Sequence, residues 1–306
     1  MKLIIFITSL LLSLNAYSFQ PTKPVTVVIG YASGSGNEIV FRKAASIVQK
    51  QNPNINFIIE NKPGSDEVVG FNHFAKQPAD GHTLFVPAIG VFVGTKTWYS
   101  NILVHDPFDV EFVISLARTP LALVANSEKG VKTLEEFNQL SGAVNIGVGA
   151  AIQRVAYEYL RSNMKAQTEM IGYRSPALAA VDVAGGQVHY GIFPASSAYE
   201  FYKAGKVRYL GITGNTVPSK IQGTILLKFS LVGQVGVVLP RNTDPTIVKF
   251  WEKTFLNALR TAEYTEFLND IMWYTLPEDQ NSVGYEKLMI EQRKLWAPYV
   301  DKIKLN

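Results

Sequence analysis

The 306-residue sequence contains no cysteine. A disulfide framework, a thiol nucleophile and a lipid-modified cysteine are therefore excluded, and the fold must be held by its hydrophobic core. The sequence also lacks a large excess of one charge, since it has 29 Lys plus Arg and 25 Asp plus Glu. The basic residues are scattered along the chain. Such a distribution argues against a nucleic-acid-binding surface.

Signatures of catalysis and metal binding are also missing. There is no Gly-x-Ser-x-Gly elbow, and the four histidines (His73, His82, His105 and His189) fall in no metal-ligand spacing. Gly34 and Gly36 lack the third glycine of a dinucleotide fingerprint, since Ile39 stands in its place. We therefore expect no enzyme, no metal and no cofactor, and keep an exported α/β hydrolase as the enzyme alternative.

Long hydrophobic runs are confined to the N-terminus. Residues 3–14 form an apolar run of about 12 residues, which is short of the ~20 that cross a bilayer. Lys2 precedes the run, and Ala16 and Ser18 follow it as the small residues that a signal peptidase reads. The pattern predicts a signal peptide at 1–18, cleaved near Ser18, and an exported, periplasmic product; a single membrane anchor is the alternative.

The remaining chain predicts an α/β fold. Apolar, β-branched runs at 25–30, 57–59 and 83–86 alternate with a helical pattern after residue 36 and with turn signals. The same alternation restarts near Leu121 and continues to residue 212, with capping boxes at Thr133 and Ser197. Alternation of this kind favours parallel sheets covered on both faces.

The last segment is helical, with candidate helices at 246–260, 263–269 and 285–302. It offers no further sheet, so we expect it to return to the first unit. The predicted domains are residues 19–122 plus 236–306, and residues 123–235. Two lobes then enclose a ligand cleft where strands end and helices begin, with hinges near Leu123 and Gly236.

Several strings resemble one family, the substrate-binding proteins of tripartite tricarboxylate transporters, also called Bug-type periplasmic receptors. The match extends over essentially the whole chain after residue 18, and its strings lie at 23–38, 60–64, 79–84, 173–177, 184–188 and 204–208. The resemblance implies a two-lobed periplasmic binding protein that closes over a small organic carboxylate and delivers it to a membrane transporter. We also expect the protein to be a monomer. An exported sensor that presents its ligand to a membrane protein is the alternative from another class.

The sequence also departs from the family pattern. Ser65, Asp66 and Glu67 replace a glycine-rich continuation, His189 and Phe193 stand at positions that are often acidic, and the loop at 149–154 is about two residues shorter. These changes affect ligand specificity more than the fold.

A carboxylate is expected to be held by main-chain amides and hydroxyls at helix starts. The first loop is Ser33, Gly34, Ser35, Gly36 and Asn37, and the second is Gly149, Ala150 and Ala151. Two roles remain open for Gln153 and Arg154, which either contact the ligand or form a solvated first turn. Glu38 either caps the loop or accepts a hydrogen bond from an amine or a water.

The cleft wall is assigned to residues at strand ends: Tyr31, Ala88, Ile89, Tyr173, Arg174, Phe193 and Pro194. For Tyr173 the alternative is core packing, but an aromatic ring with a polar tip suits a closing surface. The apolar content of this wall suggests a ligand with an apolar or aromatic body attached to its carboxylate.

Overall fold

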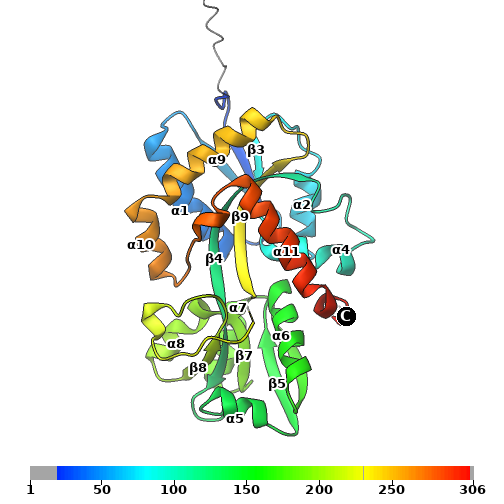
Figure 1. The fold of residues 1–306 in the computed structure, drawn as a ribbon, viewed down its shortest axis with the longest axis vertical. Coiled ribbons are helices and arrows are strands. Elements are labelled where there is room, and N and C mark those ends of the chain that lie inside the picture. The colour runs from blue at the N-terminus through cyan, green and yellow to red at the C-terminus, as the bar shows by residue number, and fades with distance from the viewer. Residues whose placement is uncertain (1–18, 230, 304–306) are drawn as a thin grey trace, which may run out of the picture.

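The long strand β4 (Val110–Asn126) runs from one lobe of the molecule into the other (Figure 1). The computed structural model describes residues 19–229 and 231–303, so the predicted signal peptide lies outside the described residues. No helix in the described ranges is long and apolar enough to span a membrane. The two-lobed α/β fold expected from the sequence is confirmed.

The first lobe contains residues from both ends of the described chain. Its strands are β1 (Val25–Ile29), β2 (Phe57–Asn61) and β3 (Thr83–Phe85), which are parallel, with β9 (Val232–Pro240) beside β3. Its helices are α1 (Gly36–Gln51), α2 (Val68–Phe74), α3 (Ile89–Val93), α4 (Thr95–Trp98), α9 (Pro245–Leu259), α10 (Ala262–Asp270) and α11 (Ser282–Val300). The helical tail packs on this lobe through α9 and α10, which contact α1.

The second lobe is formed by the middle of the chain. Its strands are β5 (Ala143–Val148), β6 (Gln167–Gly172), β7 (Tyr190–Pro194) and β8 (Val207–Ile212). Its helices are α5 (Leu134–Gln139), α6 (Ala151–Asn163), α7 (Pro176–Gly185) and α8 (Tyr199–Lys203), with 3₁₀ turns at Ala195–Ala198 and Ser219–Ile221. A third 3₁₀ turn, Pro277–Asp279, precedes α11 in the first lobe.

The strands form one mixed sheet in the order β2-β1-β3-β9-β4-β7-β5-β6, with β8 also paired to β4. The prediction of parallel sheets holds for β1 with β2 and β3, and for β5 with β6 and β7. It is wrong for β4 and β9, which pair antiparallel because the chain leaves the first lobe through β4 and returns to it through β9.

Strand β4 changes its partners where it enters the second lobe. Residues up to Pro120 pair with β9, and residues from Leu121 pair with β7 and β8. Pro120 lacks a backbone N–H, so it fits best where the ladder is interrupted. The domain boundaries at 122 and 236 and the hinges stay predictions, and we place the crossing at this exchange of partners.

One predicted helix cap is confirmed and another is wrong. The side chain of Thr133 accepts a hydrogen bond from the Glu136 amide at the start of α5, as expected for a capping box. In contrast, α8 begins after Ala198 without a side-chain cap, because residues 195–198 form a 3₁₀ turn that shifts the helix start past Ser197.

Candidate ligand-binding cleft

The strand ends of both lobes meet at one cavity of about 720 Å³. This is where open α/β sheets bind small ligands, because loops leave the strands there and helices begin. Most of the predicted site residues line the cavity: Tyr31, Ser33, Gly34, Ser35, Gly36, Asn37, Ala88, Ile89, Gly149, Ala150, Gln153, Arg154, Tyr173, Arg174 and Pro194.

The start of α1 provides main-chain donors on the first lobe. Gly34 has a φ of 81°, a left-handed conformation that glycine adopts without strain. Ser35 is the N-cap residue, but its side chain makes no capping hydrogen bond. The amides of Gly36 and Asn37, in the first helical turn, are therefore available to a ligand beside the partial positive charge of the helix end.

Glu38 does not line the cavity, and it supports the loop from behind. Its carboxylate accepts hydrogen bonds from the Gly34 amide at 3.1 Å, from Asn61 Nδ2 at 3.0 Å and from Arg42 Nε at 2.6 Å. Burial acts to raise the pKa of Glu38, but the hydrogen bonds from these three groups outweigh it and lower the pKa. Of its two predicted roles, the geometry matches loop capping.

The start of α6 provides donors on the second lobe. Gly149 packs so closely on the next loop that a Cβ there would lie 2.4 Å from the Pro176 nitrogen. Its own N–H is not free, because it donates to Gln153 Oε1 at 2.6 Å. The N-cap residue Ala150 has no side chain that can cap the helix, so the first-turn amide of Ile152, which lines the cavity, stays available at this helix end.

Two further predicted residues lie behind the cavity wall. Ala151 is buried against Gly90, where an added Cβ would approach the Ala151 Cβ to 3.0 Å. Phe193 is fully buried in the second lobe, and its ring fills the space beside Gly191. Alternation along β7 explains the second case, since successive side chains of a strand point to opposite faces and only Pro194 reaches the cavity.

An ion pair that the sequence did not indicate crosses the cleft. Arg154 Nη1 in the first turn of α6 donates to Asp66 Oδ2 at 2.6 Å, and the Tyr99 hydroxyl donates to the same oxygen at 2.8 Å. Arg154 therefore has a role that was not predicted, because its guanidinium binds a carboxylate of the other lobe. Burial and the Asp66 charge raise the pKa of Tyr99 to about 12, so its hydroxyl stays a donor.

Glu67 is the second cavity residue that sequence reasoning missed as a site residue. Its side chain is 1% exposed, and both carboxyl oxygens accept from the Ala88 amide, at 2.9 and 3.1 Å. Asn37 Nδ2 donates to it at 3.2 Å. Burial raises the pKa of Glu67 well above its ordinary value. The departure of residues 65–67 from the family pattern was the available signal.

Aromatic and aliphatic side chains form much of the remaining wall. Tyr173 lines the cavity while its ring lies over Gly147 and its hydroxyl donates to Asp182 Oδ2 at 2.8 Å. Trp273 lies against Gly36, and its Nε1 is 3.4 Å from Ser196 Oγ on the other lobe. Other apolar residues of the wall are Ile89, Leu121, Ile152, Pro176 and Val235.

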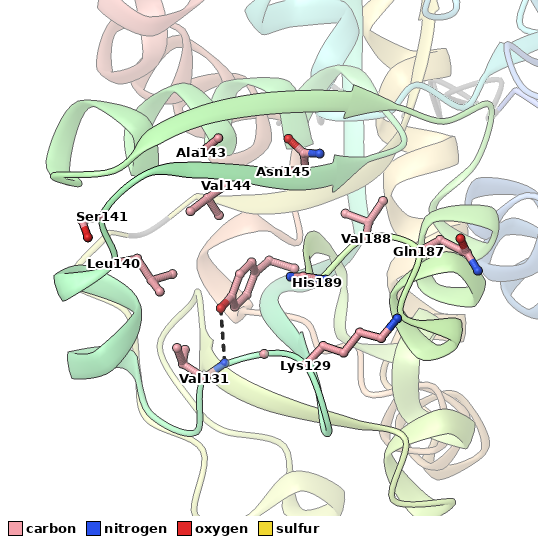
Figure 2. Close-up of a pocket in the computed structure, with 12 residues that line it drawn as sticks. Lys129, Val131, Leu140, Ser141, Ala143, Val144, Asn145, Gln187, Val188 and His189 are labelled. Atoms are coloured by element: carbon pink, nitrogen blue, oxygen red, sulfur yellow. Dashed lines mark hydrogen bonds between the residues drawn. The ribbon is translucent and has the colours of Figure 1, made fainter.

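A second hollow, of about 430 Å³, lies at the opposite ends of β5 and β7 (Figure 2). Its polar side chains, among them Asn145, Gln187 and His189, are exposed. Lys129 Nζ donates to the Gly186 carbonyl at 3.0 Å, and the Tyr190 hydroxyl accepts from the Val131 amide at 3.2 Å. The larger cavity, with its helix starts and buried polar groups, is the better ligand site. Within residues 19–229 and 231–303, no group of three or more His, Asp or Glu side chains could hold a metal ion.

Two α/β lobes around a cavity at their strand ends define a two-lobed solute-binding protein. Residues 40–305 match the profile of the tripartite tricarboxylate transporter family receptors. The chain therefore belongs to this family, whose members are binding proteins, and the resemblance noted in the sequence is confirmed.

Individual relatives agree with this assignment. A UPF0065 protein of Cupriavidus necator is 26% identical over 299 residues, which cover 93% of this chain and 89% of the relative. MatC from Rhodopseudomonas palustris, solved with bound malate, has a TM-score of 0.79 at 22% identity and covers 92% of this chain and 100% of its own. A second R. palustris protein, solved with adipate, has a TM-score of 0.81 at 21% identity, and the match covers 91% of this chain and 96% of that protein. The two structures show the same fold.

Proposed function

We propose that this chain is a periplasmic receptor that captures a small organic carboxylate in the cleft and delivers it to a tripartite tricarboxylate-type membrane transporter. The observation that carries the proposal is the convergence of two uncapped helix starts, those of α1 and α6, on one cavity. Their free amides and partial positive charges attract an anion. Membership of the receptor family supports the same role, and related structures contain malate and adipate.

The expected affinity follows from the donors. A hydrogen bond to a charged group contributes ~1.5–3 kcal/mol, so three or four of them support micromolar binding after ordering costs. The amides at the two helix starts and the hydroxyl of Ser35, which has no partner among the described residues, are the proposed donors. Arg174 is exposed at the cavity rim. The aliphatic and aromatic wall suits a ligand with an apolar body. No group of this site is proposed to act as a nucleophile or base, so the role is binding without catalysis.

Calorimetry on refolded, ligand-free protein tests the proposal with aliphatic and aromatic acids of four to eight carbons. We expect at least one carboxylate to bind with a dissociation constant in the micromolar range, and its methyl ester or amide to bind ~100-fold more weakly, because loss of the charge weakens two or more hydrogen bonds. The receptor is expected to act as a monomer, which light scattering checks. Equal binding of acid and ester would contradict an anion site.

A further inference from the structure

Glu67 folds its side chain back onto donors of its own chain. Its carboxyl oxygens accept hydrogen bonds from the Ala88 amide and from Asn37 Nδ2. These two donors lie at the base of the cavity, where they would otherwise be open to an anionic ligand. The backbone is shaped for this arrangement, because Ser65, Asp66 and Glu67 all have positive φ (47°, 48° and 77°). Gly30 makes the room, since a Cβ there would lie 2.5 Å from the Glu67 Cβ.

The occupied donors change what this part of the cavity can bind. A ligand carboxylate placed here would meet the Glu67 carboxyl in place of the N–H groups. In the part of the chain that the structure describes, no Lys or Arg forms an ion pair with Glu67, and the nearby Arg154 is paired with Asp66. Two carboxyl groups without a shared cation repel or must take up a proton. This end of the cavity is therefore unfavourable for a second carboxylate of the ligand.

Two further polar atoms of the cavity lining lack partners: an amide oxygen, which only accepts hydrogen bonds, and a hydroxyl, which accepts as well as donates. Gln234 is 1% exposed and Thr119 is 5% exposed, and both line the cavity. Among the described residues, Gln234 Oε1 and Thr119 Oγ1 have no hydrogen-bond partner. The side-chain nitrogen of Gln234 donates to Ser115 Oγ, so the Oε1 oxygen of Gln234 is the atom without a partner.

Glu67, Gln234 and Thr119 line the same cavity, and backbone pairing connects their positions. Ala88, which donates to Glu67, forms a bridge with Val235, the residue after Gln234, and Thr119 pairs with Gly233, the residue before it. A buried polar atom without a partner costs free energy, so a donor group of the ligand would gain by meeting it. Glu67, Gln234 and Thr119 are called the acceptor floor below.

We propose that the acceptor floor binds a hydrogen-bond donor of the ligand, a hydroxyl or an ammonium group at the end remote from its carboxylate, and selects against dicarboxylates. The inference rests on the proposed function, because it places the ligand's single carboxylate at the starts of α1 and α6. The ligand is then a monocarboxylate with a hydroxyl or amine at its other end.

The test compares matched straight-chain acids at each length from four to eight carbons: the monocarboxylate, the dicarboxylate, the ω-hydroxy acid and the ω-amino acid. At the length that binds best, we expect the hydroxy or amino acid to bind at least ~10-fold more tightly than the dicarboxylate. The hydroxy and amino arms distinguish a neutral donor from a cationic one, and both results support the acceptor floor.

Two variants and one control test whether the acceptor floor causes the preference for the hydroxy or amino acid over the dicarboxylate. Glu67→Gly suits the positive φ and releases the Ala88 and Asn37 donors, so the dicarboxylate should gain ~10-fold and the preference should vanish. Thr119→Val keeps the shape of the side chain and should weaken the hydroxy or amino acid ~5-fold, with the plain monocarboxylate unchanged. Asn242→Gly, at another positive-φ position (64°) outside the residues that line the cavity, should leave every ratio as in the wild type.

The outcomes separate the two proposals. If no acid of any kind binds, the proposed function is wrong. If acids bind but the dicarboxylate binds as tightly as the hydroxy and amino acids in the wild type, the acceptor floor is overturned while the proposed function stands. The acceptor floor is also overturned if folded Glu67→Gly and Thr119→Val both retain the wild-type ratios.

Discussion

Arg154 Nη1 lies 2.6 Å from Asp66 Oδ2, and this contact joins the first turn of α6 to the loop after β2 across the cleft. The Arg154 side chain is 20% exposed and that of Asp66 is 11% exposed, so solvent screens the pair only weakly. The pair joins the two lobes directly. It therefore stabilises the arrangement in which the lobes are in contact relative to a more open one.

Asp66→Asn and Arg154→Gln are each predicted to open the ligand-free protein. Each change removes one charge and leaves the other without a partner, which should lower the free energy of unfolding by about 1.5–3 kcal/mol. Small-angle scattering should show a larger radius of gyration for both variants than for the wild type.

The double variant should be no more open than either single variant, because the two residues act through one contact. Lys203→Gln is the matched control, since it breaks the exposed pair with Glu200 on α8 and should leave both size and stability unchanged. An unchanged radius of gyration in both cleft variants would show that the pair does not determine closure.

Glu38→Gln is predicted to destabilise the protein at neutral pH and to weaken carboxylate binding. The carboxylate accepts hydrogen bonds from N–H groups of Gly34, Asn61 and Arg42. A carboxamide has an NH₂ group in place of one oxygen, so one of these donors would face another donor. The loss should be about 1.5–3 kcal/mol near pH 7. Because the pKa of Glu38 is lowered, its stabilising contribution is complete above its unfolded-state pKa of about 4.3 and fades as the pH falls through the lower folded-state pKa.

Thermal melts at neutral and strongly acidic pH check this prediction. The deficit of the variant should shrink toward zero in acid. Glu263→Gln is the control, because Glu263 also binds side chains of α1, Lys43 and Lys50, but at the surface. A deficit of equal size at both pH values would point to a steric effect of the substitution.

The sequence predicted the elements of this cleft better than the contacts across it. The loop at 33–37 and the helix start after Gly149 could be located, because a glycine between a strand and an amphipathic helix is a local pattern. The pairing of Asp66 with Arg154 joins residues that are 88 positions apart. No local pattern carries such a contact, since it depends on how the two lobes meet.

Glu67 and β4 were missed for two other physical reasons. Three successive non-glycine residues with positive φ at 65–67 are strained conformations that no propensity anticipates, and the turn they form directs Glu67 inward. Pro120 usually ends a strand, so the sequence suggested a new strand near Leu121 instead of one strand from Val110 to Asn126. The exchange of partners at Pro120 explains how the strand continues.

Trp273 is predicted to report ligand binding. Its indole lines the cavity and lies within 3.4 Å of Ser196 on the opposite lobe, so a bound ligand changes its surroundings. Ligand addition should change the tryptophan emission of the wild type, and Trp273→Phe should abolish most of that change. Trp98→Phe is the control, because Trp98 donates to the Val300 carbonyl and is not among the residues lining the cavity. A full signal in Trp273→Phe would place the ligand elsewhere.

Glu67→Gln is predicted to alter the pH dependence of stability in the direction opposite to Glu38→Gln. Burial, followed by the charge of Asp66, raises the pKa of Glu67 despite the opposing hydrogen bond from the Ala88 amide. The folded state then holds the proton more tightly than the unfolded state, so the wild type loses stability as the pH rises from the unfolded-state pKa of about 4.3 toward the folded-state value.

The variant removes this titration, so its melting temperature minus that of the wild type should increase as the pH rises through this window. Thermal melts of both proteins in the same buffers, from about pH 4 to about pH 8, measure the difference. Tyr31 and Tyr285, whose pKa values are raised by burial and by the Glu67 charge, stay protonated throughout this window in both proteins. A difference that is constant across the window would contradict the prediction, because it would mean that Glu67 has the same pKa in the folded and unfolded states and that its hydrogen bonds balance its burial.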